Sequence, residues 1–203
     1  VAIRNRFLGL FLFLGLLLSL LFVESSAQWL GYLSIDNFFN ALSLGFGVGL
    51  AEELIFRGWL WGELDQLFHP KWSIVIQAFI FSLVHIRLDI HFLSLSILLL
   101  GLFLLGLLLA IRRKLDQGSL WGCIGLHGGL VGVWFAFKAG LIEISSNASA
   151  WLVGPGGESS NPLGGALAIL ALVLALFVQR TAFAMAGSPF NGARKASSKG
   201  ALP

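Results

Sequence analysis

The sequence has few charged residues: 11% of its 203 residues are Asp, Glu, Lys or Arg, against 57% that are hydrophobic. A soluble domain carries roughly 25% charged residues, so this chain could not cover a water-facing surface. The same composition excludes disorder, because disordered segments are poor in hydrophobic residues. The single cysteine excludes a disulfide scaffold, and a net charge of +3 argues against a nucleic-acid binder.

Long apolar runs are what the chain has in abundance. A membrane-spanning helix needs about 20 mostly apolar residues. Six runs approach this length, at residues 7–23, 38–61, 72–85, 91–111, 119–137 and 163–185. We therefore predict an all-α fold, a polytopic transmembrane helix bundle of about six spans. It would form a single domain over residues 1–186, followed by a basic tail at residues 187–203.

Two of these runs need a further interpretation. The first follows Arg4 and Arg6, and the small residues 25–27 after it resemble a signal-peptide cleavage site. We favour a retained span, because the run is long for a signal peptide. The Leu-rich stretch 93–109 in the fourth run has the composition of a lipid-facing helix and carries no chemistry.

The distribution of Lys and Arg predicts the orientation in the membrane. With six spans and both termini in the cytoplasm, only Arg87 and Lys138 lie outside and Arg57 lies within a span. The other ten of the 13 Lys and Arg residues then face the cytoplasm, where such residues concentrate. We predict a multi-pass integral membrane protein with cytoplasmic termini, and we expect a bacterial plasma or internal membrane.

Five ionisable residues interrupt the apolar runs: Glu52, Glu53, Arg57, His85 and His127. An ionisable group at mid-bilayer costs at least ~2.5–3.5 kcal/mol, so each needs a reason. At about 100° per residue, Glu53 and Arg57 lie about 40° apart on one helical face, whereas Glu52 lies about 140° from Arg57. We predict that Glu53 and Arg57 form a supporting ion pair, and that Glu52 is left free for chemistry.

The two histidines acquire a function only in combination with the acidic pair. Taken singly, His85 and His127 are ordinary buried histidines of a helix bundle. Together with Glu52 they lie on three different spans and can converge on one point. Such a set can activate a water and stabilise an oxyanion, or bind a divalent metal such as zinc. Glycines spaced three and four residues apart around His127 would let its helix pack closely on a neighbour.

Three motifs in order carry a family resemblance. They are E-E-x-x-x-R at residues 52–57, F-x-x-x-H at residues 81–85, and G-S-L-W followed by L-H-G-G within residues 118–129. Each is weak alone, but the ordered set resembles the CPBP family of CAAX-protease and bacteriocin-processing membrane proteins, also called the Abi family. The resemblance covers a core at about residues 42–134.

The resemblance implies an intramembrane endopeptidase acting on a membrane-associated peptide or protein. Eukaryotic relatives cleave a prenylated C-terminal motif, and some bacterial relatives act in bacteriocin maturation or self-immunity. By position, Glu52 would activate water with help from His85, His127 would stabilise the oxyanion, and Glu53 and Arg57 would support the site. We favour a mechanism without a metal, because the compact H-E-x-x-H spacing is absent. In the older alternative, Glu52, His85 and His127 hold a metal such as zinc.

One departure from the family pattern leaves alternatives open. The third motif usually has Asn or Asp four residues after its histidine, and this chain has Val131 there. A backbone N–H, a water or the Trp134 indole could replace the missing donor. Otherwise the chain is a catalytically silent member that acts as a membrane immunity or scaffold protein. A transporter with the charged cluster as an ion site is a third hypothesis, although six spans are few and no paired broken helices are evident.

Overall fold

The elements of the fold are mostly helices. The structure is a computed structural model that describes residues 27–145, 148–149, 154 and 161–185. Along these residues the chain forms β1 (Ala27–Trp29), α3 (Ile35–Glu53), the π-helical η1 (Leu54–Leu60), α4 (Trp61–Leu67), α5 (Pro70–Leu83), α6 (Phe92–Leu115), α7 (Trp121–Ala136), the π-helical η2 (Phe137–Leu141), β2 (Ile142–Ile144), the 3₁₀ turn η4 (Pro162–Gly164) and α9 (Ala166–Met185). The all-α class is confirmed. Strands β1 and β2, which the sequence analysis did not predict, pair antiparallel.

The helices coincide with five of the six predicted runs. Three helical segments in the described part of the chain are long and apolar enough to cross a membrane: Ile35–Leu67, Phe92–Leu115 and Trp121–Leu141. Two shorter apolar helices, Pro70–Leu83 and Ala166–Arg180, account for the third and sixth runs. The first predicted run and the basic tail lie outside the described residues.

Local capping explains where the helices differ from the predicted bounds. Helix α3 begins before residue 38 because the Ser34 side chain accepts a hydrogen bond from the Asn37 N–H at 3.1 Å. Helix α5 begins at Pro70, which is favoured in a first helical turn because its missing N–H needs no partner there. The same helix ends at Leu83, so His85 lies in the following turn and not in the helix.

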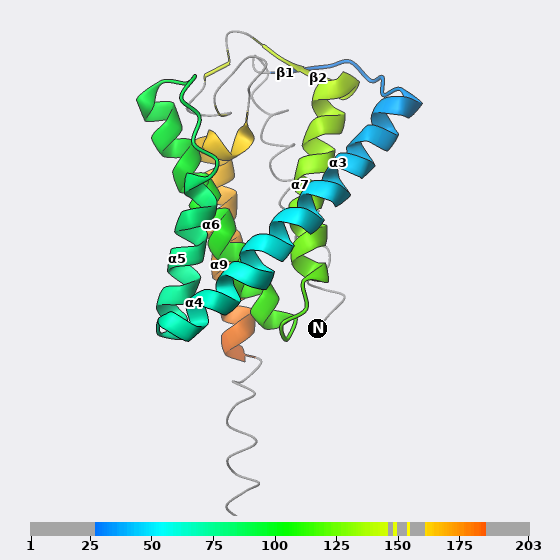
Figure 1. Cartoon of the computed structure of the whole chain (residues 1–203). Helices are drawn as coiled ribbons and strands as arrows, with labels where there is room; N and C mark the ends of the chain where they lie inside the picture. The colour runs from blue at the N-terminus through cyan, green and yellow to red at the C-terminus, as the bar shows by residue number, and fades with distance from the viewer. Residues whose placement is uncertain (1–26, 146–147, 150–153, 155–160, 186–203) are drawn as a thin grey trace, which may run out of the picture.

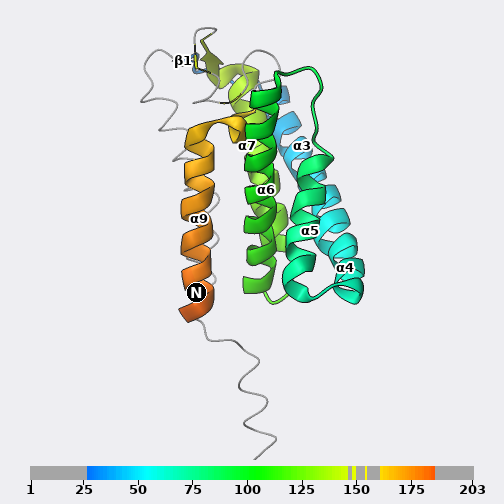
Figure 2. The same cartoon turned by 90° about the vertical axis from the view of Figure 1, so that its left-hand side faces the viewer.

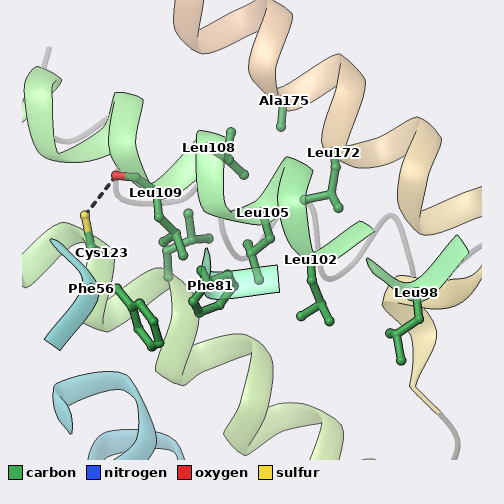
Figure 3. Packing of buried hydrophobic residues seen from close by; sticks show 11 residues of the cluster. Phe56, Phe81, Leu98, Leu102, Leu105, Leu108, Leu109, Cys123, Leu172 and Ala175 are labelled. Atoms are coloured by element: carbon green, nitrogen blue, oxygen red, sulfur yellow. Dashed lines mark hydrogen bonds between the residues drawn. The ribbon is translucent and has the colours of Figure 1, made fainter. Parts of the chain in front are cut away.

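Helix α6 lies at the centre of the bundle. It packs between α5 and α9 (Figure 2) and also contacts α7. Its leucines form much of the hydrophobic core, with Leu98, Leu102, Leu105, Leu108 and Leu109 at most 3% exposed (Figure 3). The interpretation of residues 93–109 as lipid-facing is therefore wrong for the face that these leucines form, whereas Leu93 and Leu100 are 62% and 48% exposed. A helix that is apolar on every side suits a protein interior as well as lipid, and composition does not distinguish the two.

The cysteine belongs to the same core. Cys123 on α7 is fully buried, and its thiol donates a hydrogen bond to the backbone carbonyl of Leu109 at 3.2 Å (Figure 3). This contact joins α7 to α6. Cys123 is therefore a packing residue.

Small residues allow α3 and α7 to form the most extensive helix contact in the described structure. A Cβ atom on Gly128 would lie 2.3 Å from the Gly45 carbonyl oxygen, and one on Gly132 would lie 2.6 Å from the Ala41 carbonyl oxygen. Backbones this close leave no room for a larger side chain. Helix α3 crosses the bundle obliquely (Figure 1), and the close contact with α7 brings its C-terminal acidic pair beside His127.

We predict that Gly128→Ala destabilises the protein, whereas Gly129→Ala does not. The new methyl group at position 128 meets backbone atoms that must move, and such overpacking costs about 1–3 kcal/mol. At the neighbouring glycine no atom lies within 4 Å of the added Cβ, so that variant is the matched control. Thermal unfolding in detergent measures both. Equal melting temperatures for the two variants would contradict the close helix contact.

Candidate active site

The acidic pair lies where α3 changes into a π-helix. Glu52 and Glu53 are the last residues of α3, and Arg57 lies in η1. π-Helical turns in α-helices are frequent at functional sites. Arg113 of α6 donates a hydrogen bond to the Arg57 carbonyl oxygen, and its guanidinium lies 4.8 Å from the centre of the Trp61 ring. These contacts fix η1 against α6.

Glu53 holds two partners with one carboxylate oxygen. Its Oε1 lies 3.0 Å from Arg57 Nη1 and 2.8 Å from His127 Nδ1. The side chains of Glu53 and Arg57 are fully buried, and that of His127 is 6% exposed. The predicted Glu53–Arg57 ion pair is therefore confirmed. The contact with His127 is new, and it joins the ion pair to α7.

Arg57 and Phe81 connect this cluster to the other helices. Arg57 Nη2 lies 3.4 Å from the Gly106 carbonyl oxygen of α6, and its guanidinium lies 4.3 Å from the centre of the Phe81 ring. The buried Phe81 ring also contacts His85 and His127, with ring centres 4.9 and 5.7 Å apart. In the sequence, Phe81 stands out only as the first residue of the F-x-x-x-H motif. In the structure it packs against both histidines and the arginine.

Glu52 lies between the two imidazole rings. Its Oε2 is 3.6 Å from His85 Nε2 and 3.9 Å from His127 Nε2. The Glu52 and His85 side chains are 26% and 31% exposed, in contrast to the fully buried Glu53. Both distances exceed those of direct hydrogen bonds, and Glu52 Oε2 is a buried oxygen without a hydrogen-bond partner among the described residues.

The hydrogen bonds at Nδ1 determine what each ring presents to Glu52. His85 Nδ1 lies 2.7 Å from the Phe81 carbonyl oxygen, which can only accept, so this nitrogen carries a hydrogen. His127 Nδ1 faces the Glu53 carboxylate, whose charge the arginine compensates, so this nitrogen also donates. Both rings therefore direct Nε2 towards Glu52. In a neutral ring this Nε2 is an acceptor, and in a protonated ring it is a donor.

The three side chains open into a cavity of about 640 Å³. Glu52, His85 and His127 line it, and neither Glu53 nor Arg57 is among the lining residues. Most of the wall is apolar, with leucines and valines from α3, α6 and α7. Val131 and Trp134 are both part of it, so the position that usually carries Asn or Asp in the family is a hydrophobic surface here.

Three polar residues of the cavity were not identified from the sequence. Arg87, Lys138 and Asn161 line its end near β1 and β2, and no short motif marks them. Arg87 also pairs with Asp89, and its hydrogen bonds lower the pKa of that carboxyl group from the usual value.

The two remaining histidines, His69 and His91, lie outside the cavity. His69 and His91 cap the N-termini of α5 and α6 through their Nδ1 atoms. Among the residues that the structure describes, no group of three or more His, Cys, Asp or Glu side chains is arranged to hold a metal ion. The arrangement can hold a water between a carboxylate and two imidazoles.

The comparison with known families covers the five ionisable residues of the cluster but not the whole cavity. Residues 34–133 match the family model described as type II CAAX prenyl endopeptidase Rce1-like. No curated protein and no solved structure matches the chain significantly. The matched region contains α3, α5, α6 and most of α7, with Glu52, Glu53, Arg57, His85 and His127. The apolar helices are those of an integral membrane protein, and the match over 100 of the 203 residues, together with the ordered motifs, supports membership of the CAAX-protease family.

Proposed function

We propose that the protein is an active intramembrane endopeptidase of the CAAX-protease and bacteriocin-processing type. It hydrolyses a peptide bond of a membrane-associated peptide or protein with a water activated by Glu52 and His85. The observation that carries the proposal is the different surroundings of the two acidic residues. Glu52 faces the cavity and both Nε2 atoms, whereas Glu53 is buried behind it and bonded to Arg57 and His127.

The charges of Glu52, Glu53 and Arg57 support the proposal, because they favour a carboxylate base next to a protonated imidazole. With both histidines neutral, two carboxylates and one guanidinium leave one negative charge inside the protein. A proton on one imidazole would balance the charge of the Glu52 carboxylate, whose Oε2 lies 3.6 and 3.9 Å from the two Nε2 atoms. Because both Nδ1 atoms already carry hydrogens, that proton lies on an Nε2 and points at Glu52.

The reaction then follows from the positions of these groups. Glu52 accepts a proton from the water as the water oxygen attacks the peptide carbonyl carbon. The carbonyl oxygen becomes an oxyanion, and the Nε2–H of the protonated imidazole, which we assign to His127, donates to it. When the C–N bond breaks, the proton on Glu52 moves to the leaving nitrogen. The products are a carboxylic acid and an amine, and Glu52 is again a carboxylate.

We propose that this reaction needs no metal. The H-E-x-x-H spacing of common zinc proteases is absent. The alternative, in which Glu52, His85 and His127 bind zinc, makes a different prediction for a chelator. A chelator would abolish cleavage in the zinc-dependent alternative and would leave it unchanged in the mechanism without a metal.

Cleavage of a quenched membrane-peptide library by the purified full chain in detergent tests the proposal. We expect Glu52→Gln to lose about 10²–10⁴-fold in rate, because it removes the general base and keeps the shape. His85→Ala and His127→Ala should also lose activity. Glu63→Gln, at an exposed acidic residue of α4, is the matched control and should cleave like wild type.

Two results would contradict the assignments. The roles of the acidic pair are wrong if folded Glu52→Gln keeps full activity while folded Glu53→Gln has none. Loss of cleavage on adding EDTA, with recovery on adding zinc, would replace the proposed mechanism by the metal-dependent alternative.

A second candidate is a silent family member that binds a partner as an immunity or scaffold protein. Val131 is the observation that favours it, because a hydrophobic side chain lines the cavity where the family usually has Asn or Asp. Loss of one oxyanion donor reduces a rate by about 10²–10³-fold. Such a protein would keep its partner when Glu52 is replaced by Gln.

Val131 allows a gain-of-function test that distinguishes the two candidates. If the lack of a hydrogen-bond donor to the oxyanion at position 131 limits catalysis, Val131→Asn should raise kcat by up to about 10²-fold. The reason is that the side chain at this position lines the cavity. Val131→Leu, which adds volume without a donor, is the control. An unchanged kcat for Val131→Asn in an active protein would show that another group already supplies the donor.

A further inference from the structure

A buried glutamine of α5 lies next to the Glu53–Arg57 ion pair. Gln77 is fully buried, although most of α5 is apolar. Its Nε2 lies 3.4 Å from the Gly106 carbonyl oxygen, and the same oxygen accepts from Arg57 Nη2 at 3.4 Å. Phe81 lies one turn further along the same face of α5, and its ring centre is 4.3 Å from the Arg57 guanidinium. One face of α5 therefore meets Arg57 with both an amide and an aromatic ring.

The orientation of the Gln77 amide follows from its hydrogen bonds. Its nitrogen faces two carbonyl oxygens, that of Gly106 and that of Ile74 at 3.1 Å. Carbonyl oxygens only accept, so the opposite orientation of the amide would lose both bonds. Gln77 Oε1 is then a buried acceptor that has no hydrogen-bond partner among the described residues. Arg57 Nε is a buried donor in the same condition.

An amide and a guanidinium that share one acceptor are close enough to influence each other. The amide has a dipole, and in a protein interior such a dipole acts more strongly on a charge than it does in water. Glu53 is the carboxylate that pairs with Arg57, and the same Oε1 also contacts His127 Nδ1. A displacement of Arg57 would therefore be transmitted through Glu53 to His127.

We propose that Gln77 is a positioning residue of the catalytic cluster. It fixes the Arg57 guanidinium against the Gly106 carbonyl, so that Glu53 Oε1 remains shared between Arg57 and His127. Gln77 does not line the cavity, so it acts on the reaction only through these residues. The effect on catalysis rests on the proposed function, whereas the effect on the His127 ring does not depend on activity.

Replacement of the amide by an apolar side chain of similar shape tests the proposal. Gln77→Met makes this change in the full chain. Gln179→Met is the matched control, because Gln179 is 2% exposed and its amide has no hydrogen-bond partner among the described residues. It lies on α9, which packs on the other side of α6 from α5 (Figure 2). If Gln77→Met does not fold, Gln77→Asn, which draws the amide back by one methylene, takes its place.

We expect the two glutamine variants to differ in their effect on the site and not in their stability. Exchange of a buried polar group for an apolar one of the same shape can be neutral or stabilising, so neither melting temperature in detergent should fall. In ¹⁵N spectra of histidine-labelled protein, Gln77→Met should shift the His127 ring signals and leave those of His91 unchanged. Gln179→Met should shift neither. With a cleavable peptide, Gln77→Met should lower kcat by up to about 10²-fold at unchanged KM, because it displaces a catalytic group and removes no substrate contact.

Unchanged His127 signals in folded Gln77→Met would overturn the proposal, and so would an equal shift in Gln179→Met. A lower melting temperature with unchanged His127 signals would make Gln77 a packing residue only. The spectra need no substrate, so the outcome is separate from that of the proposed function. If Glu52→Gln cleaves like wild type, the proposed function fails, and a His127 shift in Gln77→Met still supports the positioning role.

Discussion

A single buried carboxylate holds the site together. Glu53 binds Arg57 within its own helical segment and His127 on α7, and all three side chains are removed from solvent. Removal of one partner from a buried ion pair typically costs about 3–5 kcal/mol, because the other charge is left uncompensated. The three residues therefore constrain one another. Through the Phe81 ring and the Gly106 carbonyl, Arg57 extends the constraint to α5 and α6.

This constraint separates two residues that are adjacent in the chain. Glu53 is occupied by its partners and has no access to the cavity, whereas Glu52 points into the cavity between two imidazoles. The arrangement needs α3 and α7 to lie very close, and the glycines at their contact permit this. A buried structural pair thus positions a more exposed chemical group, in keeping with the need of active sites for rigid support.

Much of this could be predicted from the sequence, and the failures have a common physical origin. Five helices and the Glu53–Arg57 pair follow from hydropathy and helical spacing, which are properties of one helix at a time. The contact between Glu53 and His127 depends on which face of α7 meets α3, and a helical wheel contains no such information. The burial of one face of residues 93–109 was missed for the same reason, because lipid and protein interior favour the same side chains.

The protonation of the two histidines is the most direct test of the role of Glu53. The chain has only four histidines, so ¹⁵N spectra of histidine-labelled protein can be assigned with single substitutions. We expect that Nδ1 of both His85 and His127 carries a hydrogen, and that Glu53→Gln changes the His127 signals far more than those of His85. A neutral His127 ring with its hydrogen on Nε2 and none on Nδ1 would contradict the claim that Glu53 holds and orients it.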